Sequence, residues 1–312
     1  MGTNPWSDDA YRNLRTSYTG KSTDDVFTQN KTRTVLSDMS PVGLGIRESR
    51  DSMVHPTSIA IAVFLDVTGS MGYIPEKLVR EDLGTLMNIL IEHGVGDAHV
   101  LFGGIGDTRS DRCPLQVGQF EAGADELAKW LTGLYLEGNG GGQNRESYLL
   151  AWLVAGRHTS IDCFEKRGKK GFLFTIGDEA NWDHVSADHL KKFLGYTGTE
   201  GVTDEQLLIE AQRMYNVFHI HIQEGAYRDS KEVIGYWRDK LKERLIIVED
   251  YTTVPEVIAS TVAVMSGADL DTVINSLSNS KALAVRAAVS GAIVENGNTG
   301  ISQANPGIIN LC

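Results

Sequence analysis

Residues 59–72 read I-A-I-A-V-F-L-D-V-T-G-S-M-G, and the other features of the chain are best understood around them. The apolar run from Ile59 to Leu65 is typical of a strand that is buried on both faces. It ends at Asp66, and Thr68 and Ser70 follow at intervals of two residues. A tight turn after a strand can aim one carboxylate and two hydroxyls at one point, and a hard cation prefers oxygen ligands. The alternative is an ordinary strand-to-helix turn in which Ser and Thr only cap the helix.

Apolar runs with strand character alternate with helical patterns along residues 57–265. Further strands are expected at 98–105, 172–176, 216–222 and 245–248, with a short antiparallel edge strand at 115–120. Helices are expected near 75–94, 125–134, 149–156, 185–195, 203–214, 229–242 and 255–265. This alternation predicts an α/β fold, a doubly wound and mostly parallel open sheet with helices on both faces.

Acidic residues stand at the ends of three predicted strands. Asp66 ends the first strand, Asp107 follows the second, and Asp178 follows the strand at 172–176. Ligands of doubly wound sheets bind beyond the carboxyl ends of the strands, where the strand order reverses. We therefore expect these three carboxylates at the ligand-binding edge.

Three separated motifs carry a resemblance to a known family. Asp66-x-Thr68-x-Ser70-Met71-Gly72 resembles the first motif of the von Willebrand factor type A domain, which is D-x-S-x-S in that family and builds a metal-ion-dependent adhesion site. The second family motif has a threonine after paired glycines, and Asn144 stands nearest to it in Gly141-Gly142-Gln143-Asn144. The third is an aspartate after the following central strand, here Asp178. The resemblance covers about 57–265. The segments R-E-S-R-D-S, G-I-G-D and F-T-I-G-D-E, at 47–52, 104–107 and 174–179, are also similar to a group of intracellular bacterial and phage proteins with this domain.

The resemblance implies a set of metal ligands and a mode of binding. The implied ligands of one Mg²⁺, or of Mn²⁺ or Ca²⁺ in its place, are Asp66, Thr68, Ser70, Asn144 and Asp178. Acidic residues that support these ligands or replace them are Asp107, Glu146 and Glu179. In the family, an open coordination position of the metal takes a carboxylate from a partner protein.

Three functions are considered on this basis. The first is a metal-dependent protein-binding module in a multiprotein assembly, whose partner presents Asp or Glu. The resemblance implies an AAA+ ATPase or further copies of the chain as candidate partners, since relatives often act in such assemblies. The ATPase would be a separate protein, because this chain has no G-x-x-x-x-G-K-[ST] loop. The second is a metal-dependent hydrolase of the phosphoesterase type, although no His or Lys in these loops offers a clear general base. The third is a structural assembly subunit with a vestigial metal site. We do not expect the chain to be an enzyme, and the hydrolase is the second hypothesis.

Composition limits the partners and the compartment. A formal net charge of −12 argues against binding to nucleic acid or to an anionic membrane surface, since both need a basic field. Hydrophobic residues make up 41% of the 312 residues, which is enough for a substantial core. The 3 cysteines are far apart and indicate a reducing compartment. We expect the protein in the cytoplasm, or in a virion or another intracellular assembly.

The segments on either side of 57–265 differ from it in composition. Residues 1–56 are polar without a clear period and predict an arm with at most short structured pieces. Within them, the charge cluster at 47–52, R-E-S-R-D-S, is either a solvated lead-in or part of an arm that wraps the domain or a neighbouring subunit. Residues 266–312 predict small-residue helices followed by a polar tail. His219 and His221 lie two residues apart on a predicted strand, and we expect a structural role for both.

Overall fold

The computed structural model describes residues 4–69, 71–138 and 144–293. Ser70, most of the glycine-rich loop before Asn144 and the polar tail after residue 293 lie outside the described residues. Within them, a six-stranded sheet has the order β12-β11-β7-β2-β3-β4. Its strands are β2 (Ile59–Asp66), β3 (Ala98–Ile105), β4 (Leu115–Val117), β7 (Gly171–Gly177), β11 (Tyr215–Ile222) and β12 (Leu245–Val248). All neighbours are parallel except β3 and β4, which are antiparallel.

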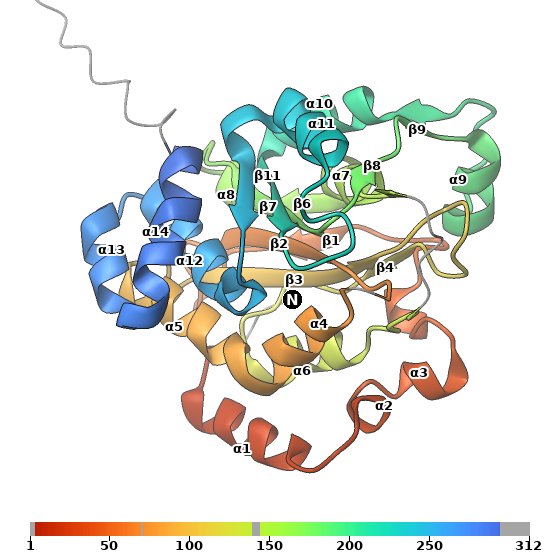
Figure 1. Cartoon of the computed structure of the whole chain (residues 1–312). Helices are drawn as coiled ribbons and strands as arrows, with labels where there is room; N and C mark the ends of the chain where they lie inside the picture. Colours follow the sequence, from red (N-terminus) through yellow and green to blue (C-terminus); the bar gives the residue numbers. More distant parts are fainter. Residues whose placement is uncertain (1–3, 70, 139–143, 294–312) are drawn as a thin grey trace, which may run out of the picture.

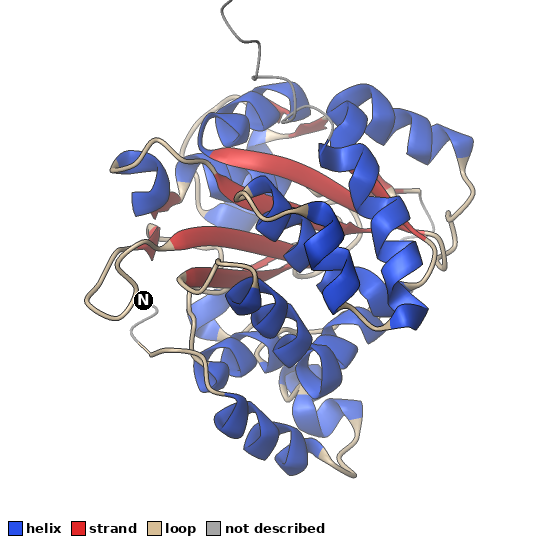
Figure 2. Ribbon diagram, turned by 90° about the vertical axis from the view of Figure 1, so that its left-hand side faces the viewer, coloured by secondary structure: helices blue, strands red, loops and turns tan. Residues whose placement is uncertain are grey.

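Strand β2 shows why helices cover both faces of this sheet. Its side chains alternate between two separate apolar cores, with Ile61, Val63 and Leu65 in one and Ala60, Ala62 and Phe64 in the other. Because successive side chains of a strand point to opposite faces, an uninterrupted apolar run requires cover on both sides. Figure 2 shows the strands between helices on either side. The expected α/β fold with a mostly parallel sheet is confirmed.

The helices divide between the two faces in Figure 1. On one face lie α5 (Leu83–Glu92), α6 (Ala124–Thr132) and α12 (Val254–Met265), whose apolar residues join the core of Ile61. On the other lie α7 (Leu149–Arg157), α9 (Ala187–Leu194), α10 (Asp204–Met214) and α11 (Lys231–Leu241), which join the core of Phe64. The helix expected from Pro75 is divided into α4 (Tyr73–Lys77), a π-helical stretch η2 (Leu78–Asp82) and α5.

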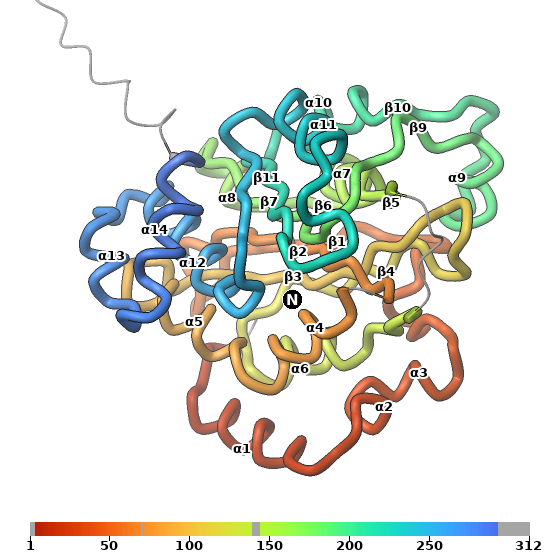
Figure 3. Tube along the Cα trace, viewed as in Figure 1, coloured from red at the N-terminus to blue at the C-terminus, as the bar shows by residue number. Residues whose placement is uncertain are grey.

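The N-terminal segment is more ordered than its polar composition indicates. It forms α1 (Asp8–Tyr18), α2 (Thr23–Val26), α3 (Gln29–Thr32) and the 3₁₀ helix η1 (Ser37–Met39), and it runs along the outside of α6 (Figure 3). Ser7 caps α1 by accepting a hydrogen bond from the N–H of Ala10. Tyr11, Phe27 and Met39 are buried in the core of Ile61. The N-terminal segment therefore lies against the domain through these contacts.

The C-terminal helices also pack on the domain. These are α13 (Leu270–Ser276) and α14 (Asn279–Ile293), and Val285 and Val289 of α14 are buried in the same core as α12. Helix α14 contacts the edge strand β12. Among the described helices, none combines the length and the apolar character that crossing a bilayer takes.

Small secondary elements complete the fold around the sheet. They are β1 (Arg47–Ser49) with β6 (Thr159–Ile161), β5 (Arg145–Glu146) with β8 (Ala180–Asn181), β9 (His184–Val185) with β10 (Val202–Thr203), the short helix α8 (Asp162–Glu165), and the 3₁₀ helices η3 (Lys242–Arg244) and η4 (Tyr251–Thr253). The pair β5 and β8 has the greatest effect on the candidate site, because it joins two loops at the carboxyl edge of the sheet.

Candidate metal centre

The three acids at the predicted strand ends lie at one edge of the sheet. Asp66 ends β2, Asp107 lies two residues beyond β3, and Asp178 directly follows β7. Strand β2 lies between β7 and β3, so the order of the strands reverses there. All three side chains are buried. The three acids therefore share the carboxyl edge of the sheet, and ligand binding at this edge stays a prediction.

Three carboxylates form the tightest group at this edge. Oxygen atoms of Asp66, Glu146 and Glu179 all lie within 4.8 Å of one another. These side chains are 1%, 2% and 8% exposed, respectively. We call Asp66, Glu146 and Glu179 the acidic cluster. The family resemblance implied only a supporting or alternative part for the two glutamates, yet they are the acids grouped with Asp66.

Backbone pairing brings the two glutamates together. Glu146 lies on β5 and is paired with Asn181 of β8, while Glu179 directly precedes β8. The N–H of Trp182 donates to the carbonyl oxygen of Glu146 at 3.1 Å, which extends the pairing. Asn181 also accepts a hydrogen bond from the N–H of Leu149 through its side chain, at 2.9 Å, and so caps α7. The position of the cluster is therefore set by a short parallel pair and a helix start.

Burial and neighbouring negative charges raise the pKa of every member of the cluster. Burial, with a smaller contribution from the charge of Asp178, raises the pKa of Asp66 to about 7. Burial and then the charge of Asp66 raise the pKa of Glu179 to about 8, and the same two causes raise the pKa of Glu146 well above its usual value. Crowded carboxylates in a dry environment disfavour one another's charged forms. A bound cation removes that penalty, because it pairs with the charges.

Several carboxylate oxygens at this edge have no protein donor. Oε2 of Glu146, Oε2 of Glu179 and Oδ1 of Asp178 are buried and make no hydrogen bond within the described part of the chain. Buried polar atoms in folded proteins normally have a partner, so each of these oxygens is open to a partner outside the described residues, and a cation is one such partner. Oxygen atoms from carboxylates are the ligands that Mg²⁺, Mn²⁺ and Ca²⁺ take. The residues present therefore fit a hard divalent cation.

Asp66 is oriented by two hydroxyl groups. The backbone N–H and the hydroxyl of Thr68 donate to its Oδ1 at 2.8 and 2.6 Å, and the hydroxyl of Tyr148 donates to its Oδ2 at 3.1 Å. Tyr148 directly precedes α7 and is completely buried. Nothing in the sequence around Tyr148 singled it out, because its role depends on a contact 82 positions away along the chain.

Two further residues implied by the resemblance, Asp178 and Asn144, lie at the same edge in different surroundings. Asp178 accepts a hydrogen bond from the N–H of Tyr227 at Oδ2, at 3.0 Å, and it is not a member of the acidic cluster. Asn144 is half-buried, and its carbonyl oxygen accepts from the N–H of Ala180 at 2.9 Å. Ser70 falls outside the described residues.

Asp107 is committed to hydrogen bonds within the protein. Its Oδ1 accepts from Nε1 of Trp182 at 2.7 Å, from the N–H of Arg109 at 3.0 Å and from the hydroxyl of Ser147 at 3.3 Å. Its Oδ2 accepts from the hydroxyl of Ser110 at 3.2 Å. Asp107 therefore organises the loop after β3 rather than presenting an unoccupied oxygen.

The two histidines of β11 belong to the interior, as expected. The ring of His219 is fully buried and stacks on Trp237, with 3.6 Å between ring centroids. Nδ1 of His219 lies 2.9 Å from the hydroxyl oxygen of Thr175, and burial lowers the pKa of His219 well below its usual value. A neutral, stacked imidazole in this position supports the packing beneath the acidic cluster.

Comparisons with known proteins give little on function. No family model and no curated protein matches the sequence. Two structures of the pilus adhesin SpaC from Lactobacillus rhamnosus GG are similar at 11% and 13% identity, with TM-scores of 0.43 and 0.45; each match covers 74% of this chain and 31% or 32% of the adhesin. Proximal thread matrix protein 1 from the mussel byssus is similar at 10% identity over 69% of this chain and 48% of that one, with a TM-score of 0.38. The chain thus spans less than half the length of these proteins, and likeness at this level carries no argument about function.

Proposed function

We propose that this chain binds a divalent cation at the carboxyl edge of its sheet and through it binds a carboxylate of a partner protein. The observation that carries the proposal is the acidic cluster, three buried carboxylates with oxygens within 4.8 Å of one another, two of which keep an oxygen without a donor among the described residues. Crowded, buried carboxylates are unfavourable without positive charge nearby. They are therefore expected where a bound cation compensates their charge.

The residues divide into two kinds of role in this proposal. Asp66, Glu146 and Glu179 supply negative charge, and Asp178 lies close enough to raise the pKa of Asp66. Thr68 and Tyr148 hold the carboxylate of Asp66 in one orientation through the hydrogen bonds described above. A bound Mg²⁺, or Mn²⁺ or Ca²⁺, keeps water molecules that a foreign carboxylate can replace.

The resemblance to the von Willebrand factor type A domain supports the binding mode. Asp66, Thr68, Ser70, Asn144 and Asp178 correspond to its adhesion-site motifs. The partner on this proposal is a protein that presents Asp or Glu, such as an AAA+ ATPase or another copy of this chain, in an intracellular assembly of a bacterium or phage.

A metal-dependent phosphoester hydrolase is the second candidate. It is favoured by the two glutamates beside Asp66, because a carboxylate-rich site can hold the ions that clamp an in-line displacement. The hydrogen bonds of Asp107 argue against it, since both oxygens of the acid that would serve a second ion are already used. The protein-binding function is therefore preferred.

The test compares the native chain with Asp66→Asn in excess Mg²⁺ or Mn²⁺ and in chelator. A ligand that binds only the folded state stabilises it by RT ln(1 + [L]/Kd), which is about 2.7 kcal/mol at one hundred times Kd. We expect the metal to raise the melting temperature of the native chain and of the control Asp239→Asn, whose carboxylate is exposed on α11, but not that of Asp66→Asn. Melting curves of the native chain that coincide in chelator and in metal contradict the proposal.

Capture of partners then separates the two candidate functions. Immobilised native chain should retain a partner in Mg²⁺ and release it in chelator or on addition of excess acetate, whereas Asp66→Asn should retain none. Turnover of bis(p-nitrophenyl) phosphate in Mn²⁺ by the native chain and not by Asp66→Asn favours the hydrolase instead.

A further inference from the structure

A row of alternating cationic and aromatic side chains lies beside the metal edge. The guanidinium of Arg109 lies 3.3 Å from the ring centroid of Trp182, and that of Arg145 lies 5.8 Å from Trp182 and 6.0 Å from the ring of Tyr236. The ammonium of Lys240 lies 5.9 Å from the ring of Tyr236. We call Arg109, Trp182, Arg145, Tyr236 and Lys240 the cation–aromatic strip.

The strip lines an open hollow of ≈ 650 Å³, together with Asp183, His184 and Asp204. The acids of this hollow have partners of their own. Asp204 accepts from the hydroxyl of Tyr236 at 2.7 Å and lies 2.8 Å from the ammonium of Lys240, and Asp183 lies 2.7 Å from His184. Because Lys240 is the partner of Asp204, the positive groups of the hollow that remain available to a ligand are Arg109 and Arg145.

The two arginines are the groups best placed to bind an anion. Arg109 is exposed and makes no ion pair with a carboxylate of the described residues. Arg145 is held in position by the carbonyl oxygen of Asn181 at 2.8 Å, and its ion pair with Glu232 is long, at 3.3 Å, with a glutamate that is 63% exposed. Stacking and the backbone contact preorganise both guanidinium groups, which lowers the cost of ordering them on binding.

Hydrogen bonds connect the strip to the proposed metal centre. Nε1 of Trp182 donates to Asp107 at 2.7 Å, and the backbone N–H of Trp182 donates to Glu146 of the acidic cluster at 3.1 Å. Arg145 directly precedes Glu146 on β5. A ligand seated in the hollow thus lies next to the edge at which a metal-bound carboxylate is proposed.

We propose that the cation–aromatic strip binds an acidic segment of the partner protein, adjacent to the carboxylate that reaches the metal. The inference rests on the proposed function and names the chemistry of its partner. Arginine forks match carboxylates in two-point hydrogen bonds, and Arg, Trp and Tyr are the residues that most often dominate protein interfaces. A single-stranded nucleic acid is the less favoured occupant, because the chain carries a net charge of −12 and buries a carboxylate cluster beside the hollow.

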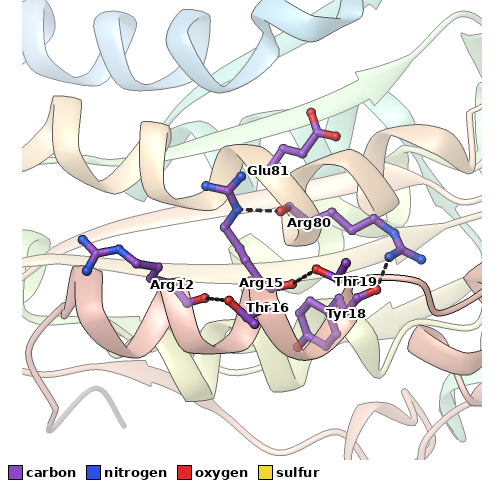
Figure 4. Close-up of a pocket in the computed structure, with 7 residues that line it drawn as sticks. All are labelled: Arg12, Arg15, Thr16, Tyr18, Thr19, Arg80 and Glu81. Atoms are coloured by element: carbon purple, nitrogen blue, oxygen red, sulfur yellow. Dashed lines mark hydrogen bonds between the residues drawn. The ribbon is translucent and has the colours of Figure 1, made fainter.

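A second hollow lined by arginines is chemically different and serves as a control (Figure 4). Arg12, Arg15 and Arg80 line it between α1 and η2. Nε of Arg15 donates to the carbonyl oxygen of Arg80 at 3.0 Å, and Arg80 donates to the carbonyl oxygens of Tyr18 and Lys21, each at 2.9 Å. Arg15 and Arg80 therefore hold the N-terminal segment on the domain, whereas Arg12 pairs with Asp9 of its own helix at 2.9 Å.

The experiment measures binding of a fluorescein-labelled hexaglutamate peptide by anisotropy at low salt in Mg²⁺. Arg109→Gln and Arg145→Gln are compared with Arg12→Gln, which removes the same charge at the other hollow. Each variant is first checked for the metal-induced rise in melting temperature, which shows that the fold and the metal centre are intact. We expect binding by the native chain and by Arg12→Gln, and binding about tenfold weaker for each strip variant, since a charge-assisted hydrogen bond is lost.

The remaining outcomes decide between this inference and the function on which it rests. Peptide binding that is lost in chelator and in Asp66→Asn but is unchanged in the strip variants overturns the inference and leaves the proposed function standing. Binding that depends on Arg109 and Arg145 but not on metal or Asp66 supports the strip and counts against the metal bridge. No binding of hexaglutamate, or tighter binding of a labelled thymidine oligonucleotide than of hexaglutamate, overturns the inference.

Discussion

The hydroxyl of Tyr148 donates a hydrogen bond to Oδ2 of Asp66 across 3.1 Å. This contact joins the residue before α7 to the last residue of the central strand β2, and both side chains are buried. The ring of Tyr148 packs edge-on against His219 and Trp237, so its hydroxyl is held in one place. The orientation of the principal acid therefore depends on an aromatic layer beneath it.

Substitution of Tyr148 by Phe tests that dependence. We expect Tyr148→Phe to weaken metal binding by about tenfold, as is usual when a group that orients a metal ligand is lost. Isothermal titration with Mn²⁺ measures the change. The matched control is Tyr215→Phe, since Tyr215 is equally buried and its hydroxyl donates to Thr159 at 2.9 Å, far from the metal edge. Equal affinities of the two variants for Mn²⁺ contradict the orienting role.

The pH dependence of stability without metal follows from the acidic cluster. The pKa is raised from 3.8 to about 7 for Asp66 and from 4.5 to about 8 for Glu179, so between these values the folded state holds more protons than the unfolded chain. The contribution of these groups to the free energy of unfolding is therefore fully present below about pH 4 and is lost as the pH rises toward 8. Because the groups interact, we expect a total loss on the order of 4 kcal/mol.

Urea unfolding in chelator at pH 5, 6.5 and 8 measures this dependence. Excess Mg²⁺ at pH 8 should restore the stability, because the cation pairs with the ionised groups. The double variant Asp66→Asn with Glu179→Gln should show a flatter profile. A metal-free chain that becomes more stable from pH 5 to pH 8 is incompatible with the crowded cluster.

Gly225 tests the surroundings of Asp178. A methyl group at Gly225 overlaps the carboxylate of Asp178, so Gly225→Ala must displace that side chain. We expect destabilisation of about 1–3 kcal/mol from overpacking, together with a smaller stabilisation by metal. The control is Gly235→Ala on α11, where a methyl group meets no atom within 4 Å and should stabilise the helix by about 0.5–1 kcal/mol. Unchanged stability of Gly225→Ala in urea would contradict the close packing at Asp178.

The N-terminal segment should contribute strongly to stability. Phe27 is completely buried in the core of Ile61, so Phe27→Ala is expected to cost about 3–5 kcal/mol. Leu283→Ala serves as the control, because Leu283 is 78% exposed and its truncation should change stability by less than about 0.5 kcal/mol. Urea denaturation gives both values. Similar stabilities of the two variants would contradict the view that the N-terminal segment is part of the hydrophobic core.

Local pattern was sufficient to predict the layers of this protein. The apolar runs of β2, β3, β7 and β11 each have strand length, and helical spacing separates them, so the parallel sheet and its acid-bearing edge could be predicted. The edge follows from chain direction alone, because strands that run parallel end on the same side. Asp66 could be predicted as a site residue for the same reason, because it ends the apolar run of β2.

Tertiary structure alone decided which acids meet and how far the domain extends. Glu146 and Glu179 approach each other through the two-residue strands β5 and β8, which are too short to leave a periodic signal. Phe27, which follows Val26, and Met39 are isolated apolar positions in a polar segment, and only contact with the folded domain buries them. A sequence pattern records the average environment of a continuous element, whereas a site or an arm depends on a few contacts between residues far apart in the chain.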